Sequence, residues 1–174
     1  MTSVAEHERK WQGLLRGQIT AATVNKFMVV MRMLDQKAQI MIFLNSLLVP
    51  VCMNALDDPV YAKAAVISMV TSIISTLAAM ICIYPKRRYR KTGDRELNLL
   101  HFNDIGHMDK DEYMNMLMPK FNEPAELAQL AIEDLYDMSR YSIIPKFMWL
   151  KVTYASFAIG NIVAIALIVA SLEF

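Results

Sequence analysis

The sequence lacks the residue patterns of the common enzyme classes. Its 174 residues contain no nucleophile elbow, no phosphate-binding glycine loop, no paired-cysteine motif and no metalloprotease helix with a His-Glu pair. His101, Asp104, His107 and Asp109 lie close together in the sequence, but their spacing matches no zinc signature. We therefore expect no catalytic residues, no metal ligands and no enzyme.

Cysteine is also scarce, with only Cys52 and Cys82 present. Both lie inside apolar runs, toward opposite ends of the hairpin that these runs would form. A disulfide would therefore have to join distant groups. We expect two free, buried thiols.

Charged residues are absent from three long stretches, namely 38–56, 64–85 and 152–172. At about 1.5 Å per helical residue, such runs extend about 28 to 33 Å, which matches the hydrocarbon thickness of a bilayer. They predict an all-α integral membrane protein with three transmembrane helices. Because no Asp, Glu, Lys or Arg lies mid-membrane, we do not expect a proton-coupled transporter or an ordinary selective ion channel.

The polar N-terminal segment lacks the apolar stretch and small-residue cleavage site of a removable signal peptide. The first span is then expected to act as the insertion signal. Ser3 and Glu6 fit a capping box, but Gly13 and Gly17 weaken the helix that would follow. A stronger amphipathic helix is predicted from about Thr20 into the first span, because apolar residues recur at three- and four-residue spacing: Val24, Phe27, Met28, Met31 and Leu34.

Cations set the expected orientation. Six of them crowd the ten positions from Lys86 to Arg95, and the N-terminal segment is also basic, so both should be cytoplasmic. The predicted organisation is a cytoplasmic amphipathic segment (1–37), a first span (38–56), a short outside turn (57–63), a second span (64–85), a small helical cytoplasmic segment (86–147) and a third span (148–172). The basic block fits an anchor on anionic lipid headgroups, with phosphate binding as the alternative. Nothing in the sequence suggests nucleic-acid binding.

Helix signals mark the cytoplasmic segment between the second and third spans. Asp109 is placed to cap a short helix that ends near Pro119, and Pro124 stands at the start of another. The residues from Leu97 to Ile105 give no clear secondary-structure signal. Pro145 should kink or break the path into the third span, and its geometry is a hypothetical coupling point between cytoplasm and membrane.

Polar side chains inside the predicted spans need partners. Small and hydroxyl residues share one face of the second span, which favours helix packing and leaves a pore lining as the alternative; they are Ser68, Thr71, Ser72, Ser75 and Thr76. Asn45 and Asn161 should hydrogen-bond to other helices. Asp35 and Lys37, at the membrane entrance, are expected to pair between helices and hold a closed state.

Several motifs together resemble the transmembrane effectors of Pycsar anti-phage systems, the PycTM family. They are Leu34-Asp35-Gln36-Lys37-Ala38-Gln39-Ile40, Leu44-Asn45, Pro85-Lys86-Arg87-Arg88, Leu100-His101-Phe102-Asn103-Asp104-Ile105 and Asp111-Glu112-Tyr113. The likeness covers about residues 33 to 171. It implies an effector in the bacterial inner membrane, paired with a pyrimidine cyclase, that responds to cyclic CMP or cyclic UMP. It also implies impaired membrane integrity and cell death before phage mature.

A cyclic nucleotide would need cations for its phosphate and aromatic and polar groups for its base and ribose. The candidates are Arg87, Arg88, Arg90 and Arg95 for the phosphate, and His101, Phe102, Asn103, Asp104 and Tyr113 for the base and ribose. About 60 cytoplasmic residues are too few for a classical cyclic-nucleotide-binding roll. We therefore expect a homo-oligomer in the bilayer, with an intersubunit pocket as one arrangement.

Two other functions remain open at this point. One is a structural or adaptor membrane protein that recruits a cytoplasmic partner through residues 97–142. The other is a ligand-independent pore-forming toxin. Toxicity on expression alone would favour the toxin, and depolarisation only with an active cyclase would favour the effector.

Overall fold

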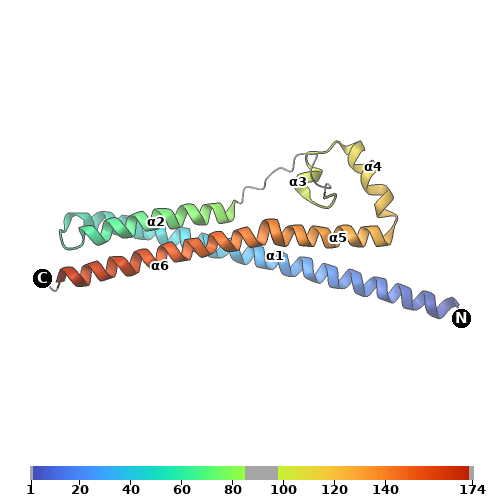
Figure 1. The fold of residues 1–174 in the computed structure, drawn as a ribbon, viewed down its shortest axis with the longest axis horizontal. Helices are drawn as coiled ribbons and strands as arrows, with labels where there is room; N and C mark the ends of the chain where they lie inside the picture. The colour runs from blue at the N-terminus through green and yellow to red at the C-terminus, as the bar shows by residue number, and fades with distance from the viewer. Residues whose placement is uncertain (1, 85–97, 173–174) are drawn as a thin grey trace. The chain divides into compact units, whose positions relative to one another are not determined.

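The computed structural model is helical and describes residues 2–84 and 98–172, apart from the side chains of residues 2–10, 102 and 103 (Figure 1). The elements are α1 (Thr2–Asn54), a 3-10 turn η1 (Ala55–Asp57), α2 (Ala62–Ile83), α3 (Phe102–Ile105), α4 (Lys110–Phe121), α5 (Pro124–Met138), a π-helical turn η2 (Ser139–Ile143) and α6 (Ile144–Leu172). Three helical stretches are long and apolar enough to cross a membrane. The predicted all-α membrane fold with three candidate spans is confirmed.

The chain divides into two compact units, which are described separately. The span unit contains residues 30–84 and 143–172, and thus the second part of α1 (residues 30–54), all of α2 and all of α6. The polar unit contains residues 2–29 and 98–142, which include α3, α4 and α5.

Helix α1 is longer than the sequence signals suggest. It begins at Thr2, so Ser3 already lies inside the helix and is not its N-cap. Gly13 and Gly17 do not interrupt it, because the loss of about 1 kcal/mol at each is small beside the many good helix formers around them.

Helices α2 and α6 form the closest backbone pair of the span unit. Small residues on α2 make this approach possible, because their side chains leave room for a neighbouring backbone. Ala64, Ala65, Ala78 and Ala79 are buried, as are Ser68, Ser72 and Ser75. The hydroxyl face of the second span is therefore a packing face in this structure.

Pro145 does not break the path into the third span. The chain stays helical from Pro124 to Leu172, and the departure from α geometry is the π-helical turn Ser139–Ile143, which ends two residues before the proline. Pro145 lacks an amide donor and its ring crowds the preceding turn, so a wider turn relieves both problems without ending the helix. The expected interruption is thus a local widening of the helix.

The caps of the polar unit follow the sequence signals. The Asp109 carboxylate accepts a hydrogen bond from the Asp111 amide at 2.9 Å and caps α4, and Pro124 occupies the first turn of α5. Helix α4 continues through Pro119 to Phe121, two residues beyond the expected end. Leu99, which sequence patterns left unassigned, is almost fully buried.

The Asp109 cap gives a first testable expectation. Asp109→Ala should destabilise α4 by about 1 kcal/mol, because the Asp111 amide loses its acceptor. Hydrogen exchange of the α4 amides should then accelerate about fivefold. Glu126→Ala, which changes a first-turn acid of α5, is the matched control; unchanged exchange in α4 of Asp109→Ala would contradict the capping role.

Candidate functional site

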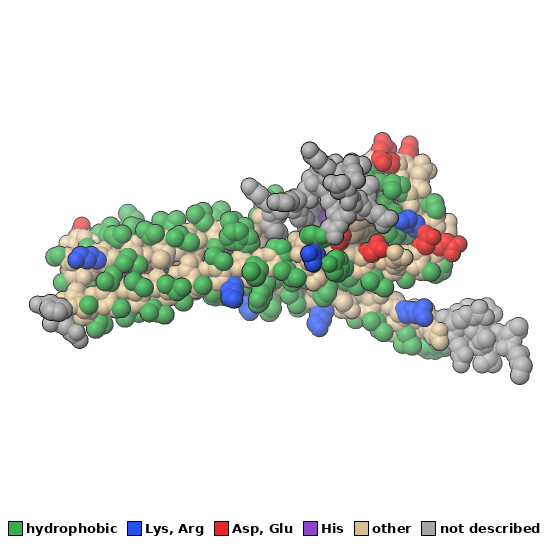
Figure 2. All heavy atoms as spheres, viewed as in Figure 1, with side chains coloured by type: hydrophobic (Ala, Val, Ile, Leu, Met, Phe, Trp, Pro, Cys, Tyr) green, Lys and Arg blue, Asp and Glu red, His purple; other side chains and the backbone are tan. Residues whose placement is uncertain are grey.

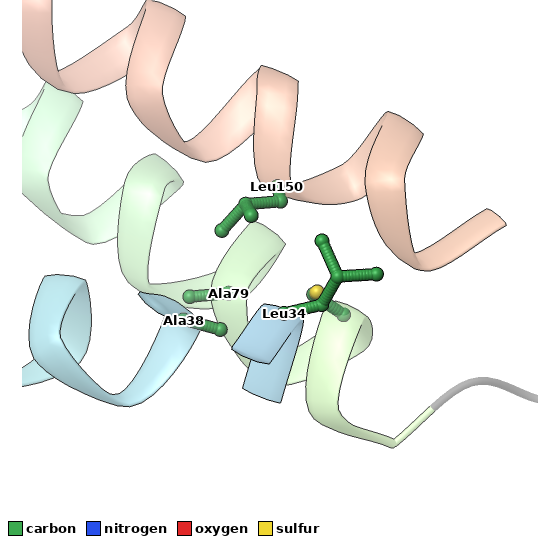
Figure 3. Close-up of a cluster of buried hydrophobic side chains, with 5 residues drawn as sticks. Leu34, Ala38, Ala79 and Leu150 are labelled. Carbon is green, nitrogen blue, oxygen red and sulfur yellow. The ribbon is translucent and has the colours of Figure 1, made fainter. Parts of the chain in front are cut away.

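An apolar cluster closes one end of the span unit. Leu34 and Ala38 of α1 pack with Ala79 and Cys82 of α2 and with Leu150 of α6 (Figure 3). All five are almost fully buried, and Val30, Ile42, Ile83 and Ile143 surround them. Cys52 and Cys82 are both buried and free, as the sequence predicts. The cluster joins all three spans at this end of the unit.

An ion pair lies beside this cluster. The Lys146 ammonium of α6 pairs with the Asp35 carboxylate of α1, and the lysine side chain is only 8% exposed against 33% for the aspartate. The Cys82 thiol donates to the Lys146 carbonyl at 3.2 Å. We call Asp35, Cys82 and Lys146 the ion-pair layer. Lys37, the other expected pairing residue, is exposed on α1 and takes no part in this pair.

A second set of polar contacts crosses the middle of the unit. The Asn45 side-chain amide of α1 donates to the Ser75 hydroxyl of α2 at 2.9 Å, and that hydroxyl donates to the Thr153 carbonyl of α6 at 3.0 Å. Asn45, Ser75 and Thr153 have no exposed surface, and we call them the amide layer. Asn45 therefore hydrogen-bonds to another helix, as expected from its position in hydrocarbon.

Two buried polar atoms near the amide layer have no hydrogen-bond partner among the described residues. They are Asn45 Oδ1 and the hydroxyl of Ser72, one turn from Ser75 on the buried face of α2. Such atoms are costly in a low-dielectric interior, by about 1–3 kcal/mol each. This part of the span unit is therefore packed less favourably than an apolar core of the same shape.

A third layer joins α2 and α6 alone. The Ser68 hydroxyl donates to the Asn161 side-chain oxygen at 3.3 Å, so Asn161 also bonds to another helix. A Cβ atom added at Gly160 would overlap the Oγ1, Cβ and Cγ2 atoms of Thr71. Only glycine lets the two helices approach this closely. We call these four residues the glycine layer.

Buried positions recur every seven residues along each of the three helices. The buried positions are Ala38, Asn45 and Cys52 on α1, Cys82, Ser75 and Ser68 on α2, and Lys146, Thr153 and Gly160 on α6. A seven-residue repeat keeps the same helix face toward its neighbours, as in coiled coils. Outside the repeat the spans are covered with exposed apolar side chains (Figure 2), a surface suited to lipid.

The candidate ligand residues fall in the polar unit or outside the described residues. Arg87, Arg88, Arg90 and Arg95 lie in the undescribed stretch 85–97, and Phe102 and Asn103 are described only as part of the backbone of α3. His101 and Tyr113 are half-buried. The geometry of the described residues therefore bears on three of the nine candidates.

Asp104 belongs to a hydrogen-bond network centred on Asn98. The Asp104 carboxylate accepts a hydrogen bond from the backbone amide of Asn98 at 3.2 Å. The side-chain amide of Asn98 donates to the carboxylates of Asp134 and Asp137 of α5 at 3.1 and 3.3 Å. The Asn98 side-chain oxygen accepts from the Leu100 amide at 3.0 Å. Asn98 thereby fastens the segment before α3 to α5. The network presents carboxylates, which suit hydroxyl and amine donors and repel a phosphate.

Sequence reasoning missed four residues of these sites: Asn98, Leu99, Lys146 and Gly160. Lys146 carried a weak signal, because a cation beside a span needs a partner as Asp35 does. Gly160 carried another, since a lone glycine in an apolar run often marks close helix contact.

Three apolar helices with polar layers between them and a small polar unit define this chain as a multi-pass helical membrane protein. A family model described as the Pycsar effector protein domain, PycTM, matches residues 20–172. The chain belongs to this family of transmembrane effectors of anti-phage defence, whose members respond to cyclic nucleotides. No curated protein and no solved structure matched.

Proposed function

We propose that this protein impairs the bacterial inner membrane when a cyclic pyrimidine nucleotide, cyclic CMP or cyclic UMP, signals infection. A paired pyrimidine cyclase makes the nucleotide, and the infected cell dies before phage mature. The observation that carries the proposal is the Pycsar effector match over residues 20–172, which includes part of the first apolar helix and all of the second, and extends to the end of the third at Leu172. The protein acts on the bilayer and catalyses no reaction.

The proposed orientation places the N-terminus and the polar unit in the cytoplasm. The cations of the N-terminal segment and of the block from Lys86 to Arg95 support it, because cytoplasmic flanks are enriched in Lys and Arg. A messenger made inside the cell then reaches the polar unit directly.

The nucleotide is proposed to bind through the polar residues that precede and form α3 and α4. Arg87, Arg88, Arg90 and Arg95 take the phosphate, and His101, Phe102, Asn103, Asp104 and Tyr113 take the base and ribose. The carboxylates around Asn98 support this division, because they favour hydroxyl and amine donors of the ligand. Several copies assemble, since so small a polar unit buries little core alone.

The closed state is proposed to depend on contacts that α1 makes with the other spans. Asp35 with Lys146 and Asn45 with Ser75 supply the polar ones, while Lys37, Pro145 and Asn161 are the remaining candidate gating positions. A ligand moves such an assembly only by binding one state more tightly than the other.

Calorimetry and depolarisation together test this function. Purified protein should release or absorb heat with cyclic CMP or cyclic UMP, and Arg88→Ala should weaken binding about tenfold or more, because a charge-assisted phosphate contact is lost. Cells that co-express an active cyclase should depolarise, and cells with a catalytically dead cyclase should not.

The control for binding is Lys63→Ala, a cation at the far end of α2. No heat with either nucleotide, together with no depolarisation, would remove the effector function. Depolarisation on expression alone would favour the ligand-independent toxin, and a healthy membrane with an active cyclase would favour the adaptor.

A further inference from the structure

The amide layer sits where a membrane protein tolerates unpaired polar atoms least. Ser72 lies near the middle of α2, which runs from Ala62 to Ile83, and its hydroxyl and Asn45 Oδ1 have no partner among the described residues. Asn45 is 0% and Ser72 1% exposed. Water that reached Asn45 Oδ1 and the Ser72 hydroxyl would hydrogen-bond to both. Hydration therefore stabilises these two side chains, while the closed packing keeps water away from them.

The three spans are held together unequally. The backbones of α2 and α6 lie close together, and Gly160 packs directly against Thr71. Helix α1 joins them through side chains, namely the apolar cluster around Leu34, the Asp35–Lys146 pair and the Asn45–Ser75 bond. Movement of α1 away from an intact α2–α6 pair therefore breaks the fewest contacts.

Such a movement exposes one chemical kind of surface. The face of α2 that meets α1 and α6 carries the hydroxyls of Ser68, Ser72 and Ser75, and α1 carries Asn45 opposite them. The other face of α2 is apolar and exposed to lipid, with Ile73, Ile74 and Leu77 about half exposed. Water can follow only the first face.

We propose that the amide layer with Ser72 is the permeation path of the active protein: when α1 leaves the α2–α6 pair, Asn45, Ser72, Ser75 and the Thr153 carbonyl become a water-filled lining for small ions. This inference rests on the proposed function, because it names the path by which the membrane is impaired. The lining carries hydroxyl, amide and carbonyl groups and no formal charge, so it passes small ions of either sign.

Cysteine accessibility tests the path directly. In a Cys52→Ala background, with the rate of that background subtracted to remove the contribution of Cys82, Ser72→Cys should react about tenfold faster with a small cationic thiol reagent once the cyclase is active, since the thiol ionises in water. Ile73→Cys, one residue away on the lipid-exposed face, is the matched control and should not change.

A second experiment leaves the native cysteines in place. Ser72→Ala removes one unpaired hydroxyl from the proposed lining and breaks no hydrogen bond among the described residues, so the protein should accumulate normally while cyclase-dependent depolarisation falls about tenfold, a shift of about 1.4 kcal/mol. Ser46→Ala and Ser156→Ala remove exposed hydroxyls that bond only within their own helices, and both should behave as the parent.

The two experiments distinguish failure of the permeation path from failure of the proposed function. Depolarisation with an unreactive Ser72→Cys, or full depolarisation by Ser72→Ala, overturns the path and leaves the proposed function standing. A parent that never depolarises with an active cyclase overturns the proposed function, and the path with it.

Discussion

Gly160→Leu should prevent α2 and α6 from packing, with a loss of about 3 kcal/mol or more in the stability of the span unit. The reason is steric: the first added carbon already overlaps the Thr71 side chain down to its Cβ, so rotation of Thr71 cannot relieve the clash and the helices must separate. The melting temperature of the protein in detergent and its level in membranes should both fall.

Matched glycines provide the controls for this effect. A Cβ at Gly13 or Gly17 meets nothing within 4 Å, so Gly13→Ala and Gly17→Ala should be neutral or stabilising by up to about 1 kcal/mol each. Gly160→Ala combined with Thr71→Gly moves the glycine from α6 to α2, so the new Cβ on α6 meets no side chain at position 71. This double variant should be much more stable than Gly160→Leu. If the Gly160→Leu protein had the same melting temperature as the parent protein, α2 and α6 would not be packed against each other at this position.

Asp35→Ala should produce the second large effect, because it leaves the Lys146 ammonium buried without its partner. Because the Asp35 side chain is 33% exposed, the cost lies between that of an exposed pair, about 1 kcal/mol, and that of a fully buried pair, about 3–5 kcal/mol. In the proposed function this loss falls on the closed state, so cells that express Asp35→Ala should depolarise without any cyclase. Membrane potential and growth after induction measure the result.

Replacing both members of the pair distinguishes the effect of an unpaired charge from the effect of lost side-chain packing. Asp35→Leu/Lys146→Met removes the buried charges together, so it should be far less leaky than Asp35→Ala. Lys151→Gln changes an exposed cation of α6 and should leave the membrane potential unaffected. If Asp35→Ala stays silent in cells without cyclase, the ion pair does not hold the closed state.

The spans were predictable because their signal is local. A run of about twenty residues without charge has few alternatives to a membrane helix, and Asn45 or Asp35 within or beside it needs a partner whatever the fold. The identity of that partner was not predictable. Lys146 follows a proline that suggested a break, and the π-helical turn that precedes both is marked by no residue pattern.

The contact at Gly160 shows a different limit. Gly160 allows close packing only because Thr71 is the α2 residue opposite it. The register of α2 against α6 is set by side chains of both helices together. Asn98 and Leu99 were missed for a related reason, since two residues after a basic block give no periodicity, and their burial arises from docking on α5. Pairwise geometry of this kind needs the folded chain.

The hairpin between α1 and α2 is closed by its own backbone. The Asp58 carboxylate accepts from the Val60 amide at 2.8 Å, the Asp58 carbonyl accepts from the Tyr61 and Ala62 amides, and Ser171 of α6 reaches the Val60 carbonyl at 3.5 Å. In the proposed orientation this turn faces the periplasm. A phage-encoded antagonist that arrives from outside would meet backbone groups in this turn that are already hydrogen-bonded to one another, which leaves it few free donors and acceptors to bind there.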